Sequence, residues 1–78
     1  MTDDDVATVA ARLTAGQRTA MASTLPGEVY AYETCPGAVR VALFTKGLFA
    51  CSRAAGLTFY ELTELGERVH HHLQETPA

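Results

Sequence analysis

Apolar residues recur at helical spacing in the first part of the chain. Four of them lie at positions i, i+3, i+4 and i+7 and therefore share one face of a helix: Val6, Val9, Ala10 and Leu13. Three aspartates precede this face, where the helix dipole favours negative charge. Thr2 and Asp5 have the spacing of a capping box. The pattern predicts a helix over residues 3–12.

A second helix is predicted directly after the first. Thr14 and Gln17 again have capping-box spacing. Three apolar residues then form a stripe on this helix: Ala20, Met21 and Leu25. Pro26 and Gly27 follow, and such a pair is typical of the end of a helix.

The segment CPGAVRVALFTKG predicts a third helix, over about residues 37–46. Pro36 would occupy the first helical position, where its missing N–H costs nothing. Three residues form the inner stripe: Val39, Ala42 and Leu43. Lys46 suits the negative end of the helix dipole, and Gly47 is the expected C-terminal stop.

Strands are predicted on either side of this helix. Residues 48–51 are expected to form a strand, residues 52–56 a turn, and residues 57–62 the returning strand of a hairpin. Residues 28–33 fit either a short strand or a single irregular helical turn, and their Tyr and Val residues favour the strand.

The hairpin leads into a fourth helix, over residues 64–73, for which Thr63 is the expected N-cap. Its apolar face consists of Leu62, Leu65, Val69 and Leu73. Tyr60 and Leu62 point to the same side of the strand because side chains alternate. Gly66 would allow this helix to approach its neighbour closely.

These elements predict a small α+β fold, in which helices pack on a short antiparallel hairpin and an extra helix precedes them. A chain of 78 residues forms one domain with a small core, here an N-terminal helix (1–12), a core (13–75) and a tail (76–78). No apolar run approaches the roughly 18 residues of a membrane span. The acidic start does not resemble a secretory leader, so a cytoplasmic location is expected.

Three segments carry a resemblance to a known family: LTAGQRTAMASTL, AVRVALFTKGLF and FYELTELGERV. Over about residues 13–74 the chain resembles the winged helix-turn-helix domain of bacterial and phage transcriptional regulators. The resemblance implies a winged helix fold, binding to double-stranded DNA and a homodimer, and we expect no cofactor. The short interval after Leu25 predicts that the first helix of the helix-turn-helix pair is a single turn or absent.

The resemblance also implies which residues would contact DNA. The helix over residues 37–46 would enter the major groove and present Arg40, Val41, Thr45 and Lys46. Arg40 would contact a guanine or a phosphate, Thr45 a base edge or a thymine methyl, and Lys46 a phosphate.

Two further cations complete this predicted DNA-binding surface. The net charge of the whole chain, however, limits its affinity for nucleic acid. Arg53 is the charge expected at the wing tip, and Arg18 would add a phosphate contact. The net charge of −3 argues against general, charge-driven affinity for nucleic acid. Affinity would therefore depend on dimer formation.

Alternation along the hairpin predicts a second, apolar surface. Four residues would face the core: Leu48, Ala50, Tyr60 and Leu62. The opposite side would then carry the contiguous patch Phe49, Cys51, Leu57 and Phe59. Either the Val6 and Val9 face of the first helix covers this patch, or it is the interface of a homodimer or of another protein. In the latter case the chain is a protein-interaction module that does not bind nucleic acid.

Three adjacent histidines near the C-terminus lie about 100° apart on a helix and cannot converge on one ion. We expect a solvated face without a metal, with one residue beside the buried stripe, for the set His70, His71 and His72. Cys35 and Cys51 are too few for a disulfide framework and are expected to be reduced thiols. A redox pair and a mixed Cys/His metal site are the alternatives. The sequence has no nucleophile elbow, phosphate-binding glycine loop or HExxH motif, so an enzyme is not expected.

Overall fold

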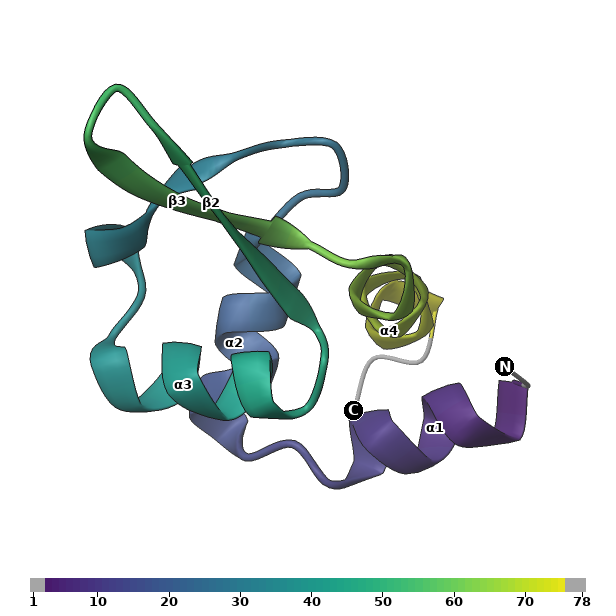
Figure 1. The fold of residues 1–78 in the computed structure, drawn as a ribbon. Helices are drawn as coiled ribbons and strands as arrows, with labels where there is room; N and C mark the ends of the chain where they lie inside the picture. The colour runs from purple at the N-terminus through teal and green to yellow at the C-terminus, as the bar shows by residue number, and fades with distance from the viewer. Residues whose placement is uncertain (1–2, 76–78) are drawn as a thin grey trace.

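The structure is a computed structural model and describes residues 3–75. Within this range the chain forms a small α+β fold of four α-helices and a three-stranded antiparallel sheet (Figure 1). The elements, in chain order, are α1 (Asp3–Ala11), α2 (Ala15–Ser23), β1 (Tyr30–Ala31), the 3-10 turn η1 (Tyr32–Thr34), α3 (Gly37–Thr45), β2 (Phe49–Ala54), β3 (Leu57–Leu62) and α4 (Glu64–Glu75). No helix in the described range is both long and apolar enough to cross a membrane.

The predicted start of α2 is confirmed. Thr14 and Gln17 form a reciprocal capping box at the start of α2, with N–H to oxygen distances of 3.1 and 3.2 Å. Thr2 lies outside the described residues. Leu25 was assigned to the stripe of α2, but this assignment is wrong because the helix ends at Ser23 and Leu25 is 52% exposed.

The end of α3 is a Schellman motif that fixes where the next strand begins. Gly47 adopts a φ of 75°, which favours glycine. Its N–H donates to Phe44 O at 3.0 Å, and the Leu48 N–H donates to Leu43 O at 2.9 Å. Leu43 and Leu48 are both fully buried. Pro36 is the N-cap residue, one position earlier than predicted.

The sheet has the strand order β1-β3-β2. In the hairpin, Phe49 pairs with Leu62 and Cys51 with Tyr60. β2 is longer than predicted, and the turn is reduced to Ala55 and Gly56, with φ values of 53° and 78°. For residues 28–33 a short strand and a single helical turn were the two alternatives, and both occur: the two-residue strand β1 is followed directly by the turn η1. The segment between α2 and α3 thus holds one helical turn, which agrees with the expectation of a single turn or none.

The prediction of which β2 side chains face the core is wrong. Leu48 belongs to the Schellman turn, so the alternation of β2 starts one residue later than assumed. Phe49 therefore faces the core, is 3% exposed, and stacks on Tyr60 with ring centroids 4.8 Å apart. Ala50 pairs with Glu61, on the side that faces away from the core.

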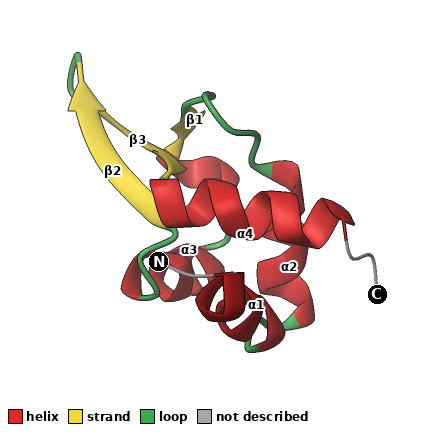
Figure 2. Ribbon diagram, turned by 90° about the vertical axis from the view of Figure 1, so that its right-hand side faces the viewer, coloured by secondary structure: helices red, strands yellow, loops and turns green. Residues whose placement is uncertain are grey.

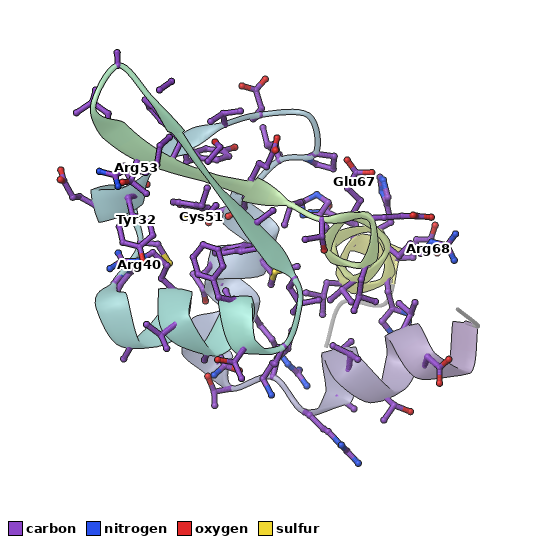
Figure 3. The ribbon with its side chains drawn as sticks, in the orientation of Figure 1. Tyr32, Arg40, Cys51, Arg53, Glu67 and Arg68 are labelled. Carbon is purple, nitrogen blue, oxygen red and sulfur yellow. The ribbon has the colours of Figure 1, made fainter. Side chains whose placement is uncertain are left out.

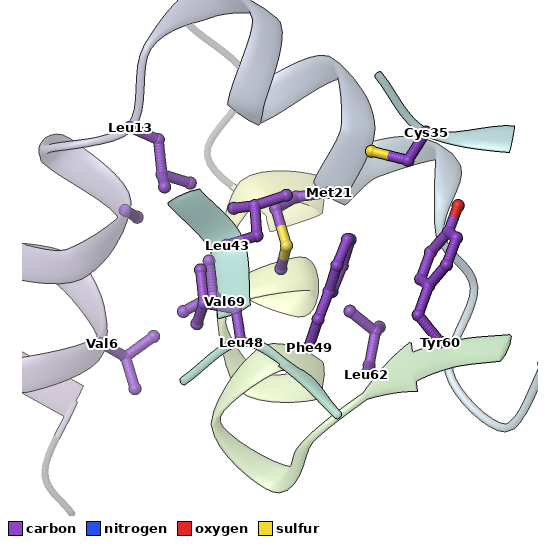
Figure 4. Close-up of a cluster of buried hydrophobic side chains, with 11 residues drawn as sticks. Val6, Leu13, Met21, Cys35, Leu43, Leu48, Phe49, Tyr60, Leu62 and Val69 are labelled. Atoms are coloured by element: carbon purple, nitrogen blue, oxygen red, sulfur yellow. The ribbon is translucent and has the colours of Figure 1, made fainter. Parts of the chain in front are cut away.

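The core lies between the sheet and the helices (Figure 4). Its buried apolar residues come from all four helices and from the hairpin: Val6, Ala10, Leu13, Met21, Cys35, Leu43, Leu48, Phe49, Tyr60, Leu62 and Val69. The main partner of α1 is α4, and α4 lies between the sheet and α1 (Figure 2). Of the two alternatives for the outer hairpin face, covering by α1 does not hold, because Val6 and Val9 belong to a helix that packs on α4.

The junction of β3 and α4 has the predicted form. The Thr63 hydroxyl accepts a hydrogen bond from the Gly66 N–H at 3.0 Å and donates one to Gly47 O at 2.6 Å. The Thr63 N–H donates to Leu48 O at 3.0 Å. A Cβ atom on Gly66 would overlap this same Leu48 carbonyl oxygen. The close approach of α4 to the turn after α3 thus requires glycine.

Candidate nucleic-acid interface

One side of α3 faces solvent along the whole helix. Its exposed residues are Gly37, Ala38, Val41, Thr45 and the following Lys46. Val41 is 57% exposed. The Thr45 hydroxyl donates to Val41 O at 2.9 Å, so its hydrogen is already used within the helix. The result is a narrow surface of small, largely apolar side chains with one cation at its end.

Arg40 was expected on this surface, but the structure gives it another role. Its Nη1 donates to Tyr32 O at 2.7 Å and to Cys35 O at 2.8 Å. Its guanidinium carbon lies 3.7 Å from the centroid of the Tyr32 ring (Figure 3). A short 3-10 turn leaves carbonyl oxygens without helical partners, and Arg40 satisfies two of them. Arg40 therefore holds η1 against the start of α3 and is not a free base-contacting group.

The remaining cations of the predicted set differ in accessibility. Arg53 is exposed, but it lies within β2 opposite Thr58, two residues before the turn, and not at the wing tip. Arg18 is half-buried, and its buried Nε has no partner in the described structure. Lys46 is exposed at the C-cap of α3. Of the four cations, Lys46 and Arg53 are the ones that a polyanion can reach most easily.

Charge is unevenly distributed over the molecule. Arg12, Arg18, Arg40, Lys46 and Arg53 precede the closing strand, and Arg68 is the sixth cation. The residues from 61 to 75 hold four glutamates. Figure 3 shows Arg40 and Arg53 on one side of the molecule, with Glu67 and Arg68 on the opposite side. The first 60 residues also hold five carboxylates and so have no net charge, whereas residues 61–75 have a net charge of −3. The side formed by α3 and the hairpin is therefore the less acidic of the two.

The predicted apolar interface is divided between three places. Phe49 is in the core, and Val6 and Val9 belong to α1, which packs against α4. Leu57 and Phe59 remain on the outer face of the hairpin, where Leu57 is 61% exposed and Phe59 is half-buried. Cys51 is exposed but lies on the opposite face, since it pairs with Tyr60.

The histidines do not form one solvated set. His70 is 4% exposed, and its Nδ1 donates to Met21 O at 2.8 Å, because a carbonyl can only accept. His71 is exposed and His72 half-buried. His70 thus joins α4 to α2 across the core, and no local pattern predicts this role. Among the described residues no group of three or more His, Cys, Asp or Glu side chains is placed to hold a metal ion.

A groove lies behind η1, apart from the exposed side of α3. It has a volume of about 550 Å³ and lies between α2, the segment around Cys35 and the inner side of Tyr60. Burial raises the pKa of the Cys35 thiol, and the charge of Arg40 partly opposes this effect. The thiol is therefore neutral at pH 7. No local sequence pattern predicts this groove, because its walls come from residues 16 to 60 and meet only in the folded chain.

Comparison with protein-family models, curated proteins and solved structures finds no match to this chain. Functional inference consequently depends on the geometry of the exposed surfaces.

Proposed function

We propose that this protein is a DNA-binding regulator of winged helix type that acts as a dimer. In this proposal α3 enters the major groove and the β2–β3 hairpin is the wing. The observation that carries it is the exposed side of α3, which no other described element covers. The element order of two helices, a short strand, a helix, a hairpin and a closing helix also agrees with the winged helix arrangement.

The side chains of α3 favour a particular kind of contact with DNA. Ala38, Val41 and Thr45 follow one another on the exposed side of the helix. Because they are small, the helix backbone can come close to the base edges, and apolar groups of this kind contact the C5-methyl group of thymine. Lys46 and Arg53 would neutralise phosphates on either side. Arg40 acts indirectly, by fixing the start of α3.

The small number of cations makes a quantitative prediction. Each neutralised phosphate contributes about −0.9 to the slope of log K against log salt concentration. A subunit with two accessible cations would have a slope of roughly −2, and a dimer roughly twice that value. Two phosphate contacts give one subunit little electrostatic affinity for DNA, and a dimer doubles their number. The proposal therefore includes a dimer.

The direct test is selection of bound duplexes from a random pool, followed by affinity measurement on the enriched sequence. Lys46→Ala and Arg53→Ala should each weaken binding and reduce the salt slope by about 1. Arg68→Ala, on α4, removes the same charge from the opposite side and should leave both quantities unchanged. Failure to enrich any sequence, or equal loss in all three variants, would reject the proposal.

A second candidate function is a protein-interaction module without nucleic-acid binding. The observation that favours it is the exposed apolar pair Leu57 and Phe59 on the outer face of the hairpin. Affinity through this surface should depend weakly on salt. Leu57→Asn should abolish such an association, as measured by sedimentation, and titration of the wild type with DNA should show no binding.

A further inference from the structure

The groove behind η1 is chemically distinct from the surface of α3. Its volume of about 550 Å³ lies in the range of small-molecule sites in proteins, roughly 300–1,000 Å³. Its walls are provided by α2, by the segment before α3, by β1 and by β3: Gly16, Thr19, Ala20, Ser23, Thr24, Tyr30, Thr34, Cys35, Pro36, Val39 and Tyr60. None of these lining residues has a charged side chain. In Figure 4 the Cys35 sulfur and the Tyr60 ring lie at the same end of the core cluster.

The absence of charge in this lining restricts the ligand. A carboxylate or an ammonium group in the groove would lose water without gaining an ionic partner, which is unfavourable. The apolar parts of the wall include Ala20, Pro36 and Val39. Tyr30 and Tyr60 add two stacked rings with centroids 5.5 Å apart. Such a wall is suited to a neutral, flat and apolar molecule.

Thr19 in α2 and Thr24 at its C-cap present acceptors to the groove and withhold donors. A hydroxyl group has one hydrogen and two lone pairs. The Thr19 hydroxyl donates its hydrogen to Ala15 O at 3.0 Å, and the Thr24 hydroxyl donates to Ala20 O at 2.7 Å. Both hydrogens are therefore bound to the helix, and the oxygens keep lone pairs.

The opposite wall repeats this arrangement. The Thr34 hydroxyl donates to Ala31 O at 2.8 Å and lies 3.0 Å from the Tyr60 hydroxyl oxygen. Because Thr34 has already used its only hydrogen, Tyr60 must be the donor in the second contact. The Tyr60 oxygen is thus another acceptor. Of the six hydroxyl groups in the lining, these four offer lone pairs while their hydrogens are engaged. The other two belong to Ser23 and Tyr30, and the Tyr30 oxygen accepts from the Leu25 N–H at 2.9 Å.

We propose that this groove binds a neutral aromatic molecule that carries an N–H or O–H donor. The aromatic part packs against the half-buried Tyr30 ring and on Val39 and Pro36, whereas the Tyr60 ring is already stacked between Tyr30 and Phe49. The donor group points to the hydroxyl oxygens of the walls. This proposal does not depend on DNA binding, since neither Lys46 nor Arg53 lines the groove.

Indole and three analogues test the chemistry of the groove. Indole has one N–H donor and no charge, 1-methylindole lacks the donor, and indole-3-carboxylate and tryptamine carry opposite charges. Titration followed by amide chemical shifts should show indole shifting the groove residues. 1-Methylindole should bind roughly fivefold more weakly, the loss expected for one neutral hydrogen bond. Both charged analogues should bind more weakly than indole.

A matched pair of variants tests the location. Ser23 and Ala22 are neighbours on α2 and both are exposed, but only Ser23 lines the groove. Ser23→Phe should obstruct the groove and abolish the indole shifts, whereas Ala22→Phe should preserve them. Thermal unfolding of both variants verifies that each is folded before titration.

Three results would overturn the proposal. The first is the absence of indole-induced shifts at the groove in the wild type. The second is equal binding of indole and 1-methylindole, which would refute the role of the acceptors. The third is indole binding that Ser23→Phe leaves unchanged, which would place the site elsewhere.

Discussion

Replacing Gly66 with alanine perturbs the contact between α4 and the turn after α3. In a helix interior alanine is favoured over glycine by about 1 kcal/mol. At this position, however, the new Cβ would overlap the Leu48 carbonyl oxygen and lie 3.2 Å from Leu62 Cδ2. Because the overlap is with backbone, a rotamer change cannot relieve it and α4 must move.

The cost can be worked out from the contacts at the junction. Overpacking of this kind costs about 1–3 kcal/mol. Movement of α4 also weakens the 3.0 Å hydrogen bond from Thr63 N–H to Leu48 O, which is worth about 1 kcal/mol. After subtraction of the helix preference, Gly66→Ala should lower the free energy of unfolding by about 1–3 kcal/mol. For a domain of this size that lowers Tm by roughly 4–8 °C per kcal/mol.

Gly16→Ala is the matched control, because it makes the same change in another helix. Its Cβ would lie 3.8 Å from Val39 Cγ2, an ordinary packing distance. Gly16→Ala should therefore raise the free energy of unfolding by up to about 1 kcal/mol. Urea unfolding followed by far-UV circular dichroism measures both. If Gly66→Ala were as stable as the wild type while Gly16→Ala gained stability, the argument for the junction would be refuted.

Three further predictions concern the hairpin turn, the buried histidine and the thiols. Ala55→Asn should stabilise the protein by about 0.5–1 kcal/mol in the same unfolding assay, because Asn tolerates the positive φ of 53° better. His70→Ala leaves a buried carbonyl unpaired and should cost about 2 kcal/mol or more, whereas the exposed His71→Ala should change stability by less than about 0.5 kcal/mol. Burial raises the pKa of the Cys35 thiol and so lowers its thiolate fraction. Mass spectrometry should therefore find Cys51 alkylated well before Cys35, and equal rates would contradict the buried position.

Local signals in the sequence predicted most of the helix and strand positions. The Thr14 capping box, the Gly47 stop and the Thr63 cap each depend on residues within five positions of one another. Such short-range chemistry is readable from one sequence. The single turn before α3 was also predictable, because the interval after α2 leaves little room for a longer helix.

Errors arose where a long-range contact or a one-residue offset decided the outcome. The Schellman turn takes up Leu48 and shifts the alternation of β2, so Phe49 is in the core. Arg40 appeared free on a helical wheel, but its partners are carbonyls of the preceding turn. The partner of His70 is 49 residues away in sequence. No local sequence pattern predicts these three contacts.

The measurement that tests the central claim most directly is affinity for an enriched duplex in which each thymine is replaced in turn by uracil. This change removes one methyl group and nothing else. If Val41 and Thr45 contact thymine methyls, at least one replacement should weaken wild-type binding by about 1 kcal/mol. The same replacement should have a much smaller effect on Val41→Ala. Equal affinity at every replaced position, or no enriched duplex at all, would contradict recognition of DNA by α3.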